Sequence, residues 1–168
     1  MAILSIMKIG NPVLTKTCEP VVKVDHKTKK LIKNMFETMY KSGGCGLAAP
    51  QVGITKRIVV IDVTGGDRPI LMINPKIIEA NGEQIDYEGC LSIPGKAGMV
   101  LRPHYVKVQA YNENMESFEL EGTGLLARAI CHELDHLDGH LYIEKIVNDL
   151  VDTMDIKEEK VYDNLSND

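Results

Sequence analysis

The stretch TGLLARAICHELDHLDGH, residues 123–140, decides how the rest of the chain folds around it. Its apolar residues recur at helical spacing on more than one face: Leu125, Leu126, Ala129, Ile130, Leu134 and Leu137. A helix that is apolar on more than one face is buried in a core instead of lying on a surface. The pattern therefore predicts a central helix over 123–138 that sheets enclose, with Gly139 as its stop.

Strand patterns fill the middle of the chain ahead of this helix. RIVVID (57–62) and ILMIN (70–74) are apolar runs, and Pro75 interrupts the second one. KIIEANGEQIDY (76–87) predicts a hairpin around Asn81-Gly82, and YVKVQAYN (105–112) predicts a strand that pairs with SFEL (117–120). Consecutive strands of this kind favour antiparallel sheets.

Helical patterns lie on both sides of the strands. DHKTKKLIKNMFETMYKSGG (25–44) has a helical period, with Asp25 as a cap and Gly43-Gly44 as a stop, and a last charged helix is predicted over 148–163. The fold class is therefore α+β, with antiparallel or mixed β-sheets packed around the central helix, an N-terminal helix and a C-terminal helix. With 168 residues and 44% hydrophobic content, we expect a single domain over 1–168.

Composition excludes several classes of function. The net charge is −5 and no basic stripe is present, which argues against direct nucleic-acid binding. No apolar run approaches the roughly 20 residues of a membrane helix, and the N-terminus lacks the pattern of a signal peptide. We expect a cytoplasmic, monomeric protein whose four cysteines are thiols and not disulfides.

The central helix carries a pair of histidines at metal-binding spacing. His132 and His136 are four residues apart, so both imidazoles can point to one metal ion from the same helix face. Glu133 and Asp135 project to either side of that direction, and the longer Glu133 is the better general base. Asp135 can instead orient a ligand, and His140, beyond Gly139, is expected at the surface. The alternative is a polar helix end that has no metal.

A catalytic site needs a third ligand, and the spacing alone does not identify it. The metzincin pattern would place a third histidine where this chain has Tyr142. Glu159 and Asp163 have the thermolysin-like spacing, but their charged surroundings favour a solvated helix. Among cysteines, Cys131 turns away from its neighbour His132, whereas Cys45 and Cys90 each follow a glycine and stay open as candidates.

Three stretches together resemble the bacterial peptide deformylases: GCGLAAPQ (44–51), EGCLS (88–92) and HELDH (132–136). The resemblance implies that Cys90, His132 and His136 bind the metal and that Glu133 is the general acid and base. It also implies that Gln51 and the backbone N–H of Leu91 stabilise the oxyanion, and that Gly46 binds the substrate backbone. The chain departs from the family at Cys131, where the family usually has glutamine.

The resemblance further implies a reaction and a cofactor. The enzyme would hydrolyse the formyl amide on the N-terminal methionine of new polypeptides and release formate. One divalent ion is expected, Fe(II) first, with Zn(II), Ni(II) or Co(II) able to replace it. Gly44, Gly46 and Gly89 would let a peptide backbone approach, because no Cβ blocks it. Leu125, Ala129 and Cys45 would line the methionine pocket, although plain core packing also explains them.

Two other functions and one contact complete the predictions. A general zinc peptidase would use Glu159 as the third ligand, and a structural metal domain would close the fourth position with Cys131. A deformylase is favoured over a structural metal domain because a closed structural site does not need Glu133. Separately, we expect Glu88 to pair with Arg102 and so hold the loop that carries Cys90.

Overall fold

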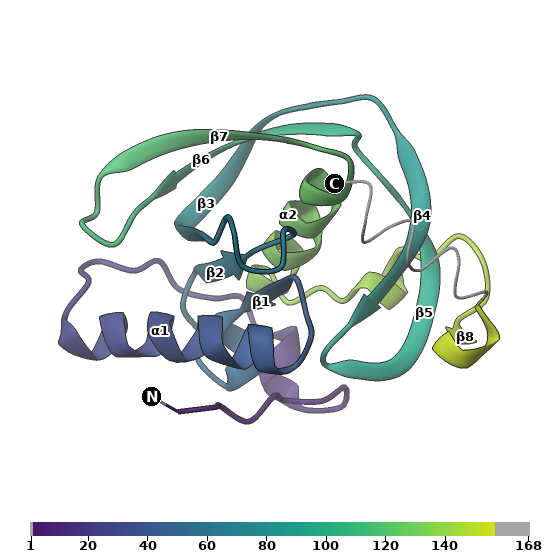
Figure 1. Cartoon of the computed structure of the whole chain (residues 1–168), viewed down its shortest axis with the longest axis horizontal. Helices are drawn as coiled ribbons and strands as arrows, with labels where there is room; N and C mark the ends of the chain where they lie inside the picture. The colour runs from purple at the N-terminus through teal and green to yellow at the C-terminus, as the bar shows by residue number, and fades with distance from the viewer. Residues whose placement is uncertain (1, 157–168) are drawn as a thin grey trace.

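The computed structural model describes residues 2–156, and in it two β-sheets lie around one helix, α2 (Gly124–Leu137) (Figure 1). The five-stranded sheet has the order β1-β2-β3-β6-β7, and its strands are Gly46–Ala48, Ile58–Ile61, Ile70–Asn81, Tyr105–Tyr111 and Ser117–Thr123. The three-stranded sheet has the order β4-β5-β8, and its strands are Gln84–Cys90, Ile93–Arg102 and Val151–Asp152. All of these pairings are antiparallel. The α+β class is therefore confirmed.

The central helix is enclosed as its sequence predicts. Nearly every residue of α2 is buried, and the helix contacts β1, β2, β6 and β7 of one sheet and β5 of the other. Its last residue is Leu137, Asp138 is the C-cap, and Gly139 follows with a φ of +80°. A Cβ on Gly139 would lie 2.5 Å from the carbonyl oxygen of Thr15, so close packing as well as the turn requires glycine there.

The N-terminal helix α1 (His26–Lys41) covers the other face of the β1–β2 region. The Asp25 side chain accepts a hydrogen bond from the Thr28 N–H and so caps the helix as predicted. Met35 and Met39 are fully buried against this sheet, which gives the domain its second apolar cluster. Four short 3₁₀ helices connect the larger elements: η1 (Pro12–Thr15), η2 (Ala49–Val52), η3 (Tyr142–Glu144) and η4 (Thr153–Asp155).

Three sequence predictions of local structure were wrong. Strand β3 does not stop at Pro75, because a β-bulge between Ile73 and Lys76 absorbs the proline, which has no N–H to donate. The turn at Gly82 does not make a hairpin: β3 pairs with β2 and β6, whereas β4 pairs with β5, so the chain passes there from one sheet to the other. Residues 148–156 contain β8 (Val151–Asp152) and η4 (Thr153–Asp155) instead of the predicted helix, and 157–163 lie outside the described residues.

Strand β5, which the sequence analysis did not anticipate, forms the partner of β4. Together they run along the side of α2, from Gln84 near Gly124 to Cys90 near the histidines (Figure 1). In the part of the chain that the structure describes, no helix is long and apolar enough to cross a membrane.

Candidate metal centre

Three candidate ligands converge where β4 meets α2. Cys90 is the last residue of β4, and His132 and His136 lie on α2; one ligand atom of each lies within 4.8 Å of the others. The Cys90 Sγ is 3.4 Å from the His136 Nε2. A sulfur and a nitrogen bound to one tetrahedral ion lie about 3.5 Å apart, given typical bond lengths of about 2.3 and 2.05 Å. The donor atoms and their spacing therefore fit a divalent metal.

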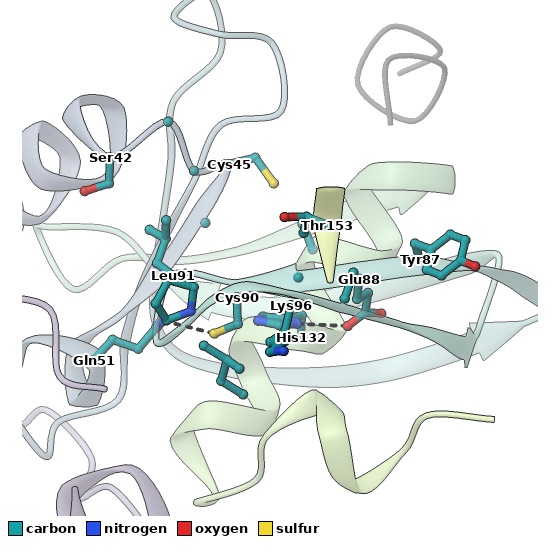
Figure 2. Close-up of a pocket in the computed structure, with 18 of the residues that line it drawn as sticks. Ser42, Cys45, Gln51, Tyr87, Glu88, Cys90, Leu91, Lys96, His132 and Thr153 are labelled. Carbon is teal, nitrogen blue, oxygen red and sulfur yellow. Dashed lines mark hydrogen bonds and ion pairs between the residues drawn. The ribbon is translucent and has the colours of Figure 1, made fainter. Parts of the chain in front are cut away.

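Glu88 fixes the orientation of His132. Its Oε1 lies 2.9 Å from the His132 Nδ1, so that nitrogen carries the proton and Nε2 is left to bind a metal (Figure 2). Arg102 donates two hydrogen bonds to Glu88, of 2.9 Å to Oε1 and 2.7 Å to Oε2, and Arg128 donates another of 2.7 Å. The predicted pair of Glu88 and Arg102 is thus confirmed. Burial alone would raise the pKa of Glu88, but Arg102 and His132 hold it well below its usual range.

The two carboxylates beside the histidine pair take different positions. Asp135 accepts a 2.8 Å hydrogen bond from Arg102, so it supports His132 only through Arg102 and Glu88. Glu133 lies on the cavity side, buried, with its Oε2 4.0 Å from the His132 Nε2. Only Glu133 is therefore placed to exchange a proton with a substrate.

The environment of Glu133 suits acid and base chemistry. Burial raises the pKa of Glu133 to about 7, although nearby His132 opposes the shift. Its Oε1 is buried without a hydrogen-bond partner among the described residues, so this acceptor is free for a water or substrate proton. A Cβ on Gly46 would lie 2.5 Å from the Glu133 Oε2, so only glycine leaves room for the carboxylate.

The Gln51 amide is held in one orientation beside Cys90. Its Oε1 accepts a 2.9 Å hydrogen bond from the Ala48 N–H, which turns Nε2 toward the centre. Nε2 lies 3.2 Å from the Ser92 Oγ. It also lies 3.4 Å from the Cys90 Sγ (Figure 2). The Ser92 contact was not predicted, although a serine inside EGCLS was a visible signal. Gln51 is therefore a preorganised donor at the edge of the centre.

A cavity of about 630 Å³ opens onto the centre. It is lined by Glu133, Gln51 and Leu91, by the candidate ligands Cys90 and His132, and by every predicted substrate-binding residue: Gly44, Cys45, Gly46, Gly89, Leu125 and Ala129. The remaining candidate ligand, His136, is 1% exposed and does not line the cavity. Burial and the nearby Glu133 raise the pKa of Cys45 to about 11, so its thiol is a neutral part of the wall.

Of the other residues considered at the centre, Cys131 and His140 lie away from it. Cys131 lines a different cavity, with Arg102 and Asp135, so it does not supply the fourth position of a closed site. Tyr142 stacks on His132 with ring centroids 5.9 Å apart. His140 is exposed and its Nδ1 lies 3.3 Å from the Glu144 Oε2, as expected for a surface residue. Glu159 and Asp163 lie outside the described residues.

Known proteins resemble the chain over almost its whole length. The family model described as polypeptide deformylase matches residues 3–152. A peptide deformylase of Agathobacter rectalis is 60% identical over 152 residues, which cover 90% of this chain and 95% of that protein. Crystal structures of peptide deformylases from Legionella pneumophila and Thermotoga maritima superpose with TM-scores of 0.85 and 0.84. They are 40% and 43% identical and cover 86% and 88% of this chain, and 86% and 100% of their own.

Proposed function

The chain belongs to the polypeptide deformylase family, metal-dependent hydrolases that remove the N-terminal formyl group from nascent polypeptides, and we propose that Cys90, His132 and His136 hold its metal ion. The observation that carries the proposal is the convergence of these three ligand atoms within 4.8 Å at the floor of a cavity that also contains Glu133. A site with three protein ligands keeps one position for water or substrate, which is the arrangement of catalytic rather than structural ions.

The donor set also bears on which ion is bound. One thiolate and two imidazoles suit Fe(II) and Zn(II) better than Mg²⁺ or Ca²⁺, which prefer oxygen ligands. We propose Fe(II) as the physiological ion, with Zn(II), Ni(II) or Co(II) able to replace it. When bound, the ion supplies an activated water at neutral pH and polarises the formyl oxygen.

The residues around the ion have different roles in the reaction. Gln51 Nε2 and the Leu91 N–H donate to the formyl oxygen as negative charge develops on it, each contributing about 3 kcal/mol by analogy with other oxyanion donors. Glu133 accepts the proton of the attacking water and returns it to the departing nitrogen. Formate and a free α-amino group leave. Glu88 keeps His132 in the tautomer that binds metal.

The cavity accommodates the formyl-methionyl end of the peptide. Gly44, Gly46 and Gly89 let the substrate backbone come close to the protein backbone, where a peptide strand can pair with the loop edge. Leu125, Ala129 and the neutral Cys45 thiol form the wall against the methionine side chain. Gly44 also packs closely, because a Cβ there would lie 2.8 Å from the Leu91 Cδ1 and would force the Leu91 side chain to move.

We also propose that residues 1–168 are a single catalytic domain, that the protein is a cytoplasmic monomer, and that it does not bind nucleic acid directly. The match of the family model to 3–152 supports the single domain, and the net charge of −5 supports the absence of direct nucleic-acid binding.

The proposal is tested by anaerobic purification, metal analysis and assay on formyl-Met-Ala-Ser against acetyl-Met-Ala-Ser. Glu133→Gln should keep the metal and lose deformylation, whereas Glu144→Gln, an exposed carboxylate outside the cavity, should keep both. Cys90→Ala should lose the metal. Full metal retention in Cys90→Ala, or cleavage of internal peptide bonds by the wild type, would contradict the proposal.

A further inference from the structure

The N-terminal segment is fastened to both sides of the catalytic cavity. The Met7 N–H donates a 2.7 Å hydrogen bond to the Gln51 carbonyl, and the Ile9 N–H donates one of 2.9 Å to the Ser92 carbonyl. Figure 1 shows this segment passing beneath α1 toward the turn between β4 and β5. The residue between the two bonds, Lys8, is thus held at the cavity, although none of the three motifs contains it.

Lys8 places a positive charge at the mouth of that cavity. Its side chain is exposed and lines the cavity, and its Nζ lies 3.4 Å from the Leu91 carbonyl oxygen. An ammonium group has three N–H donors, so two stay available after this contact. The backbone hydrogen bonds of Met7 and Ile9 hold the backbone of Lys8 in place beside the cavity.

The other lysine and arginine side chains of the cavity wall are paired with carboxylates, whereas the wall carboxylate Glu133 is buried at the centre. Glu88 and Arg128 pair with each other, and Lys96 pairs with Asp152 at the surface. Lys8, in contrast, has no carboxylate partner among residues 2–156. A protein with a net charge of −5 therefore presents a locally unpaired cation where its substrate enters. An exposed ammonium group at this place attracts a peptide that carries a carboxylate.

We propose that Lys8 is a specificity-determining residue, which selects formylated peptides with an acidic side chain shortly after the formyl-methionine. The inference rests on the proposed function, since the cavity must be the entry for a formyl peptide. An exposed ion pair changes an equilibrium constant by up to about fivefold. The preference is therefore about two- to fivefold in kcat/KM, and it weakens with ionic strength because both charges are exposed to solvent.

The experiment compares amidated peptides, so that a terminal carboxylate does not substitute for the acidic side chain. The parent is formyl-Met-Ala-Ser-Ala-amide, with Asp or its neutral isostere Asn at the second, third or fourth position in turn. The ratio of kcat/KM for Asp over Asn is measured for the wild type, Lys8→Met and Lys8→Glu. Lys56→Met is the control, since Lys56 is exposed, pairs with Glu19 and does not line the cavity.

We expect an Asp/Asn ratio of about two to five at one of the three positions or more, in the wild type and in Lys56→Met. The ratio should fall to one in Lys8→Met and below one in Lys8→Glu, and salt should reduce it in the wild type. Ratios of one at every position, or a ratio that survives Lys8→Met, would overturn the inference. In both cases cleavage of the neutral parent peptide shows that the proposed function itself holds, whereas no cleavage of any formyl peptide would reject both.

Discussion

Replacing Arg102 with methionine tests whether the buried ion network holds the metal centre in place. Arg102 is 4% exposed and makes three charged hydrogen bonds, two to Glu88 and one to Asp135. Methionine keeps much of the apolar stem but leaves the buried Glu88 with Arg128 as its remaining cationic side-chain partner.

The expected loss of unfolding free energy in Arg102→Met follows from the burial of these charges. Removing one partner of a buried ion pair costs about 3–5 kcal/mol, because the other charge is left incompletely compensated. Since Arg128 still donates to Glu88, we expect the lower end, about 3 kcal/mol of unfolding free energy, or a Tm lower by roughly 6–12 °C. Loss of the group that orients Glu88, and through it His132, should weaken metal binding by about 10- to 100-fold.

The assay is chemical unfolding of the metal-free protein, together with competition for metal against a chelator. Lys56→Met is the control, since the side chain of Lys56 is 48% exposed and pairs with the exposed Glu19. That variant should lose about 1 kcal/mol or less and keep its metal affinity. Arg102→Met with unfolding free energy within 1 kcal/mol of the wild type and unchanged metal affinity would refute the reasoning about the network.

Three further changes probe the packing around the site and the acid stability of the fold. Gly46→Ala should displace the Glu133 carboxylate and lower kcat by about 10²-fold or more with metal retained, measured by formate release; full activity would show that Glu133 can move without cost. In Asp62→Asn the unfolding free energy should fall less steeply on acidification than in the wild type, as measured by chemical unfolding at a series of pH values. An equally steep fall at low pH would contradict this. Burial raises the pKa of Asp62, but hydrogen bonds from Thr64 and Tyr40 lower it overall, so the wild-type contribution is complete above the unfolded pKa near 3.8 and is lost as pH falls below it. Tyr142→Phe removes a buried hydroxyl without a partner among the described residues, so the unfolding free energy should stay equal or rise by about 1 kcal/mol; a loss of that size would show that the hydroxyl has a partner.

The elements that the sequence predicted correctly are those whose signals are local. Asp25 caps α1 and Gly139 ends α2, because capping and left-handed turns depend on one or two residues. The alternation in 105–112 and 117–120 gave the β6–β7 pair with Lys107 opposite Glu121. Periodicity likewise gave the buried position of α2, since an enclosed helix must be apolar on several faces.

The predictions that were wrong concern strand pairing, which depends on residues far apart in the sequence. The residues at Gly82 are typical of a hairpin turn, but β3 pairs with β6 and β4 pairs with β5. The residues around the turn do not indicate these pairings. Pro75 reads as a strand end, yet a bulge lets β3 continue through it. The charged segment 148–156 has helical composition, but Val151 and Asp152 pair with β5.

The candidate site divides in the same way. Helix periodicity places His132 and His136 together, whereas Cys90 arrives from another element and was distinguished from Cys45 only through the resemblance to a known family. Arg128 and Lys8 were missed. Arg128 was visible as a charge on an otherwise apolar helix, but Lys8 reaches the cavity through hydrogen bonds to Gln51 and Ser92 that the sequence does not reveal.

X-ray absorption at the edge of the native metal, in protein purified without oxygen, tests the central claim most directly. The account predicts one sulfur ligand at about 2.3 Å and two imidazole nitrogens at about 2.0–2.1 Å, with the sulfur lost or the metal absent in Cys90→Ala. Cys131→Ala should leave the spectrum unchanged, since Cys131 faces the second cavity. A spectrum without sulfur, or one with two sulfur ligands, would contradict a centre made of Cys90, His132 and His136.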